Sequence, residues 1–144
     1  MKRKLSIIFI ALIIVGTCLS GCSNKKPTVE IDSLQITYNV KPGSTAVGNT
    51  LTTEVRNNSA YTLRFVYVTY SFSNNAPDDK VSSLGSINPG NSSELSTLYN
   101  VSVDSNSAVS FKTIEYVVQK EDGSSEKIIY NCESNSYEVS DFRG

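Results

Sequence analysis

Few residues in this chain are of a type that performs chemistry. The 144 residues contain no histidine, which excludes Ser-His-Asp and Cys-His catalytic arrangements, histidine-containing zinc sites and the commonest general base. The acidic pairs Asp78-Asp79 and Glu121-Asp122 carry oxygen ligands of the kind that bind calcium, but neither has the spacing that wraps an ion. We therefore expect solvated acidic loops at both places, and we predict no enzyme activity, no cofactor and no metal site.

The thiols are the remaining candidates for chemistry. Of the three cysteines, Cys22 has the most suitable neighbours, because the small residues Ser20 and Gly21 precede it and let an extended backbone enter a protease. Upstream, basic residues at 2–4 are followed by an apolar run that begins at Leu5. This is the layout of a secretory signal, and at about 15 residues the run is too short for a membrane-spanning helix, which needs roughly 20.

The four residues Leu19-Ser20-Gly21-Cys22 resemble the bacterial lipobox. The resemblance implies that diacylglycerol is attached to the Cys22 sulfur and that the chain is cleaved between Gly21 and Cys22. Residues 1–21 are then a helical signal peptide, and Cys22 anchors the protein to the extracytoplasmic face of a bacterial membrane. Two acyl chains suffice for a stable anchor. Cys18 is the rival site, although Thr17 before it is a poor small residue, and an ordinary buried or disulfide-bonded role for Cys22 is the other alternative.

Cleavage also changes the size and charge of the protein. The mature chain has 123 residues, enough for one domain, and a net charge of −4, because three of the 13 basic residues and none of the 14 acidic ones are removed. Such a composition argues against nucleic-acid binding. With Lys25 and Lys26 as the only cations near the anchor, it also argues against adhesion to anionic lipid. Cys132 is left without an intramolecular partner, and we interpret it as a small hydrophobe in a strand, with an intermolecular bridge or a reactive thiol as alternatives.

The mature chain alternates apolar and polar residues with the period of two that is typical of strands with one buried face. The segment from Leu63 to Phe72 is the strongest, and aromatic and β-branched residues on both of its faces indicate a central strand. Turn residues recur at roughly 10-residue spacing. We predict an all-β fold, an immunoglobulin-like antiparallel β-sandwich of about seven to eight strands. It occupies residues 29–140, after a lipidated tether at 22–28 and before a flexible tail at 141–144.

Three motifs resemble the FxLYD type of small extracellular β-sandwich module. They are Val55-Arg56-Asn57-Asn58-Ser59 at a strand end, Val66-Tyr67-Val68-Thr69-Tyr70-Ser71-Phe72 in a strand, and Ile87-Asn88-Pro89-Gly90-Asn91-Ser92 in a turn. The resemblance covers about a third of the chain and implies an immunoglobulin-like sandwich without catalytic residues. This sequence departs from the FxLYD pattern after the central strand, where Ser73-Asn74-Asn75 replaces the expected Tyr-Asp pair.

Tyrosine is the most abundant aromatic residue, with eight copies, and the chain has no tryptophan. The tyrosine ring carries a polar hydroxyl and suits flat contacts with sugars, peptides or proteins. If Val66 and Val68 face the core, Phe65 and Tyr67 lie on the opposite face and form a candidate interaction surface. The alternative is that this face is covered. We also expect partial exposure of Tyr61, Tyr99, Tyr116, Tyr130 and Tyr137.

These observations predict a non-catalytic interaction module that binds an unidentified protein or a cell-wall component. One alternative is a small-ligand or glycan binder that uses a tyrosine-lined surface. Another is an inhibitor or immunity-type lipoprotein that presents a loop such as Asn74 to Lys80.

Overall fold

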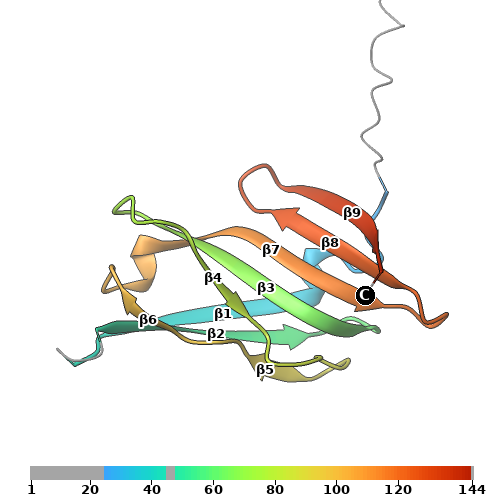
Figure 1. The fold of residues 1–144 in the computed structure, drawn as a ribbon, viewed down its shortest axis with the longest axis horizontal. Coiled ribbons are helices and arrows are strands. Elements are labelled where there is room, and N and C mark those ends of the chain that lie inside the picture. The colour runs from blue at the N-terminus through green and yellow to red at the C-terminus, as the bar shows by residue number, and fades with distance from the viewer. Residues whose placement is uncertain (1–24, 45–47, 144) are drawn as a thin grey trace, which may run out of the picture.

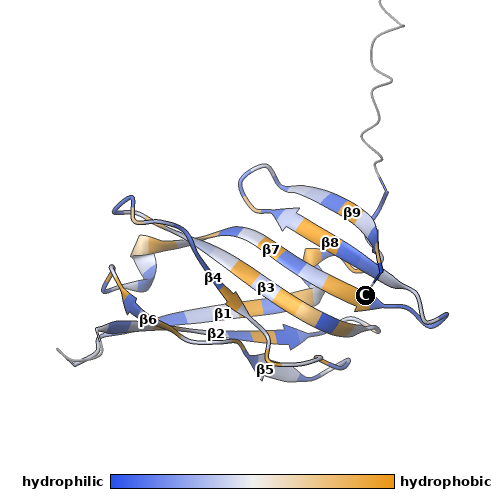
Figure 2. Ribbon diagram, in the orientation of Figure 1, coloured by the Kyte–Doolittle hydropathy of each residue, from blue (hydrophilic) through white to orange (hydrophobic). Residues whose placement is uncertain are grey.

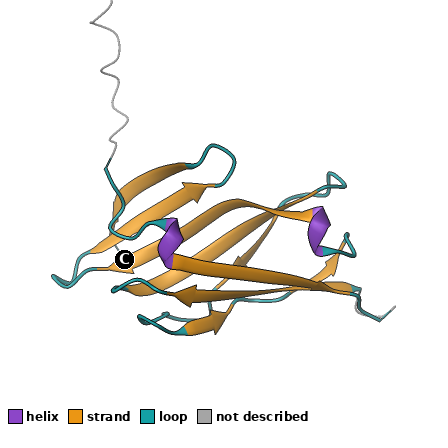
Figure 3. Ribbon diagram, turned by 180° about the vertical axis from the view of Figure 1, so that it is seen from behind, coloured by secondary structure: helices purple, strands orange, loops and turns teal. Residues whose placement is uncertain are grey.

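The computed structural model describes residues 25–44 and 48–143, which fold into two layers of antiparallel strands (Figure 1). Two short 3-10 helices, η1 (Ile31–Ser33) and η2 (Asn106–Ala108), lie at opposite ends of the layer that contains β1 (Figure 3). The strands are β1 (Leu34–Lys41), β2 (Asn49–Asn57), β3 (Thr62–Phe72), β4 (Asp79–Ser82), β5 (Ser92–Glu94), β6 (Leu98–Val101), β7 (Val109–Gln119), β8 (Ser125–Asn131) and β9 (Ser136–Phe142).

The first sheet contains β1, β2, β5 and β6, with β5 and β6 both paired to β2 on the side away from β1. The second sheet has the order β4-β3-β7-β8-β9. The two antiparallel sheets pack face to face, and the predicted all-β sandwich is confirmed. The described residues form nine strands rather than about seven to eight, and the short strands β5 and β6 each pair separately with β2.

The core lies between the two sheets and is built from the inward-facing residues of the strands. Figure 2 shows hydrophobic residues recurring along β3, β7 and β8. Val66, Val68 and Tyr70 of β3 are fully buried, as their alternation predicts. The Tyr70 hydroxyl lies 2.7 Å from the Thr53 hydroxyl of the other sheet, so the two layers also share a buried hydrogen bond. Burial raises the pKa of the Tyr70 phenol, which keeps it neutral.

A β-bulge in β3 explains the one place in this strand where strict alternation fails. The pairing with β7 shifts between Leu63 and Phe65, which leaves Arg64 as an extra residue. Strict alternation from Val66 would turn Arg64 toward the core. The bulge instead buries Leu63 completely and leaves Arg64 half-buried beside Phe65.

The sandwich has two distinct ends. We call the one that carries Lys25, the β7–β8 turn at 120–124 and the start of β3 the N-terminal end, and it lies at the right in Figure 1. The other, the loop end, carries the connections at 73–78 and 102–108 and lies at the left. Of the helices in the described part of the chain, none has the length and hydrophobicity needed to cross a bilayer.

Candidate functional site

The predicted lipidation residue Cys22 lies outside the described residues, which begin at Lys25. The signal peptide at 1–21, including its expected helix, lies there too. Lipidation of Cys22 therefore stays a prediction from the sequence.

Phe65 and Tyr67 lie on the outer face of the five-stranded sheet, opposite the buried Val66 and Val68. Phe65 is 37% exposed, and its neighbour across the sheet is the buried Val117 of β7. Its ring meets that of Phe142 at a centroid distance of 6.4 Å in an edge-to-face arrangement. Apolar surface on this outer face is therefore concentrated around Phe65.

Charged side chains cover the region around Tyr67. The Lys80 amine lies 4.2 Å from the centroid of the Tyr67 ring, a cation–π contact. The Glu115 carboxylate then binds Lys80 at 3.3 Å and Lys127 at 3.0 Å, which links β4, β7 and β8. Burial alone would raise the pKa of Glu115, but the two lysines outweigh it and hold the pKa below its usual value.

The tyrosines do not gather into one surface. Tyr70 and Tyr116 are fully buried, whereas Tyr99 is 63% exposed. The expected exposure of Tyr116 is wrong, because this residue is one of the inward-facing residues of the central strand β7. Its hydroxyl donates a 2.7 Å hydrogen bond to the Val29 carbonyl. The remaining tyrosines are half-buried: Tyr38, Tyr61, Tyr67, Tyr130 and Tyr137. The rings of Tyr130 and Tyr137 pack together at a centroid distance of 5.0 Å, and Tyr38 packs against the buried Tyr70.

Tyr99 borders a cleft of about 390 Å³ at the loop end, which we call the loop cleft. Its walls come from β6 and from the β3–β4 connection, two segments that are far apart in the sequence. The cleft is lined by Phe72, Ala76, Pro77, Asp78, Asp79, Tyr99, Asn100, Val101 and Ser102. It therefore includes a large part of the loop at 74–80 that the sequence analysis singled out.

Hydrogen bonds hold the two walls of the loop cleft together. The Asn74 amide donates to the Ser102 carbonyl at 3.2 Å, and its oxygen accepts from the Ala76 backbone at 3.1 Å. Asp78 forms an ion pair with Lys112 and accepts a 2.9 Å hydrogen bond from Ser71. The bond to Lys112 is the main reason that the pKa of Asp78 lies below its usual value. This carboxylate therefore holds the loop in place and is poorly suited to proton transfer at neutral pH.

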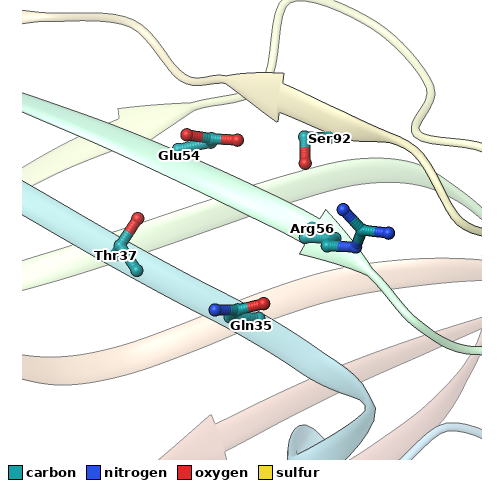
Figure 4. Close-up of a pocket in the computed structure, with 5 residues that line it drawn as sticks. All are labelled: Gln35, Thr37, Glu54, Arg56 and Ser92. Carbon is teal, nitrogen blue, oxygen red and sulfur yellow. The ribbon is translucent and has the colours of Figure 1, made fainter.

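A second candidate surface is the outer face of the four-stranded sheet. Side chains from β1, β2 and β5 surround a shallow depression of about 230 Å³ there (Figure 4). Its lining is polar throughout and contains no aromatic ring: Gln35, Thr37, Glu54, Arg56 and Ser92. Such a surface provides hydrogen bonds but no stacking platform for a sugar.

The structure places Asp78 and Asp79 at the start of β4, with Asp79 as its first residue, and Glu121 and Asp122 in the β7–β8 turn. Asp79 accepts a hydrogen bond from the Lys80 backbone, and Asp122 accepts from the backbone and the hydroxyl of Ser124. Within residues 25–44 and 48–143, no group of three or more cysteine or acidic side chains is close enough to hold a metal ion.

Cys132 follows β8 and is half-buried against the core. Burial raises the pKa of its thiol, which lowers the thiolate fraction at neutral pH.

Comparison with family models, with curated proteins and with solved structures gave no match to this chain. The resemblance to the lipobox and to the FxLYD type therefore stays a prediction from the motifs.

Proposed function

We propose that this protein is a lipoprotein, anchored through Cys22 at the extracytoplasmic face of a bacterial membrane, that binds a protein or a cell-wall component without catalysis. The observation that carries the binding role is the loop cleft beside Tyr99. It combines an exposed aromatic ring, the apolar residues Ala76 and Pro77, and polar residues that are fixed by hydrogen bonds in one place.

The cleft is suited to take a few side chains of a partner. Its volume of about 390 Å³ lies at the lower end of the range for ligand sites. Tyr99 and Pro77 supply rigid apolar contact, and tyrosine is enriched among the residues that dominate binding energy at interfaces. Because Asn74 and Asp78 already fix the surrounding loop, binding there loses little conformational entropy.

A protein or peptide partner fits this surface better than a glycan. The alternative of a tyrosine-lined sugar site requires several exposed rings side by side, and Tyr99 is the one tyrosine whose surface is mostly exposed to solvent. An inhibitor or immunity-type role uses the same loop, because residues 76–79 form one wall of the cleft. The identity of the captured partner separates this role from a structural one.

The test is site-specific photo-crosslinking in living cells. A benzophenone amino acid is placed at position 99 and, as a matched control on the four-stranded sheet, at the exposed position 37. We expect a discrete adduct from position 99 that disappears when Pro77→Asp is added, and no adduct from position 37. An adduct from position 37 alone would place recognition on the other sheet and refute the proposal.

A further inference from the structure

The first described residues are bound to the domain and do not form a free tether. The Lys25 amine contacts Asp141 at 3.0 Å and Glu126 at 3.3 Å, and the Thr28 backbone donates a 2.8 Å hydrogen bond to Glu126. Glu126 is 1% exposed and also binds Lys120. From Lys25 onward, the chain is therefore fixed to β8 and β9 at the N-terminal end.

This attachment limits how far the domain can stand from a lipid on Cys22. Cys22 precedes Lys25 by three residues, and an extended chain spans at most about 3.6 Å per residue. Their Cα atoms therefore lie within about 11 Å of each other. If Cys22 is lipidated, which is the proposed function on which this inference rests, the N-terminal end must lie at the bilayer surface.

The same end carries a patch formed by Arg64, Phe65, Phe142 and Arg143. Phe142 and Arg143 directly follow Asp141, which binds Lys25. The Arg64 guanidinium lies 5.8 Å from the centroid of the Phe65 ring and 5.9 Å from that of Phe142. Arg64, Phe142 and Arg143 line a depression of about 470 Å³.

The charges around this patch favour a phosphate ligand. Lys25 and Lys120 are engaged by Asp141 and Glu126, whereas neither Arg64 nor Arg143 forms an ion pair within the described part of the chain. Of the nearby carboxylates, Asp141 lies in the lining of the depression and is paired with Lys25 at 3.0 Å, whereas Glu121 and Asp122 lie in the adjacent β7–β8 turn, outside the lining. Guanidinium groups bind phosphate oxygens in a bidentate manner, and aromatic rings beside them suit the interfacial layer of a bilayer.

We propose that Arg64, Phe65, Phe142 and Arg143 form a membrane-contacting patch that binds phospholipid headgroups and orients the anchored domain. Along the chain, Lys25 and Lys26 are the only cations near Cys22, which favours no lipid adhesion. The fold brings two distant arginines to the same end. In this orientation the loop cleft lies at the other end of β3, about 30 Å away along an 11-residue strand.

The test uses the mature chain, residues 22–144, with Cys132→Ser so that Cys22 is the single thiol. Cys22 is coupled to a maleimide lipid in vesicles of phosphatidylglycerol and phosphatidylcholine. Because the chain has no tryptophan, Phe142→Trp and Tyr99→Trp each supply one fluorophore, and brominated lipids quench a ring that contacts the bilayer. If Phe142→Trp prevents folding, Phe65→Trp supplies the fluorophore in the patch instead.

We expect quenching and a blue shift for the tryptophan at position 142, and neither for the one at position 99. Arg64→Gln with Arg143→Gln should abolish the quenching, whereas Arg56→Gln, on the other sheet, should not change it. Equal quenching at 142 and 99, or quenching at 142 that survives the double arginine substitution, overturns the patch. Since the lipid is attached chemically, the result is independent of whether cells lipidate Cys22, which the mass of the cellular protein reports separately.

Discussion

Asn57 shows how one polar residue can organise a whole end of the sandwich. It is fully buried at the end of β2, and its amide donates to the Tyr61 and Ile87 carbonyls at 2.7 and 2.9 Å. Its side-chain oxygen accepts from the backbone and the hydroxyl of Ser59. The residue therefore ties the β2–β3 turn to the turn before β5, and its burial gives the Asn-Asn-Ser motif a structural role.

Replacing this residue should destabilise the fold strongly. Asn57→Ala removes both amide hydrogen bonds and the two that Ser59 donates to the Asn57 oxygen, and we expect the free energy of unfolding to fall by about 2–3 kcal/mol. Urea denaturation followed by circular dichroism measures this loss. Asn58→Ala is the matched control, because Asn58 is exposed and, among the described residues, its side chain forms a hydrogen bond only with Arg56. The substitution keeps the backbone hydrogen bond from Asn58 to Ser33, so a change below about 0.5 kcal/mol is expected. Equal effects of the two substitutions would contradict this role.

At the scale of the elements, the N-terminal segment is held to β8 through one buried carboxylate, Glu126. Burial alone would raise its pKa, but hydrogen bonds from the Thr28 backbone, Lys120 and Lys25 outweigh burial and lower the pKa below the ordinary 4.5. A carboxyl whose pKa is lowered by folding stabilises the native state above its unfolded pKa. This stabilising contribution decreases as the pH falls below 4.5, the pKa in the unfolded chain, and is lost once the pH has fallen through the lowered pKa of the folded state.

The pH dependence of Glu126→Gln tests this attachment. At pH 7 we expect the substitution to lower the free energy of unfolding by about 2 kcal/mol, because hydrogen bonds to a charged group are replaced by neutral ones. At pH 3 the difference between the two proteins should shrink, since this carboxyl is then largely protonated in the unfolded chain, where its pKa is the ordinary 4.5. Urea denaturation at both pH values measures this difference in the free energy of unfolding. Glu138→Gln is the control, because Glu138 is exposed. A difference that does not depend on pH would show that the charge of Glu126 does not hold the segment.

The strands could be predicted from the sequence wherever a regular alternation of buried and exposed residues decides the structure. This alternation predicts β1, β3 and the β7–β8 hairpin. The turn at Asn88-Pro89-Gly90 is predicted instead from its residue types, and Gly90 adopts φ +77° there. The bulge at Arg64 and the division of residues 92–101 into β5 and β6 depend on the pairing partner. Period-two alternation carries no information on that partner.

The candidate sites were less predictable, because they join residues that are far apart along the chain. The outer-face position of Phe65 and Tyr67 follows from alternation, but the covering of Tyr67 by Lys80 depends on how β4 pairs with β3. The loop cleft joins residues 72–79 to 99–102, and Glu126 joins Lys25 to Lys120. Each of these contacts is made by the tertiary fold, so no local pattern indicates it.

For the whole molecule, the structure separates two surfaces. The N-terminal end carries the chain that leads to Cys22 together with the patch of Arg64 and Arg143, and the loop end carries Tyr99. A strand of 11 residues lies between them. In the proposed orientation, the loop cleft is presented away from the bilayer, where a partner in the cell envelope can reach it.

The proposed function depends most on the lipid anchor at Cys22. The mass of the protein extracted from membranes tests this anchor most directly. We predict a chain that begins at Cys22, carries the mass of a diacylglyceryl group on that residue, and fractionates with membranes. Cys22→Ala should retain residues 1–21 and carry no lipid. An unmodified Cys22 in the mature protein, or the same lipid mass on the Cys22→Ala chain, would contradict the account.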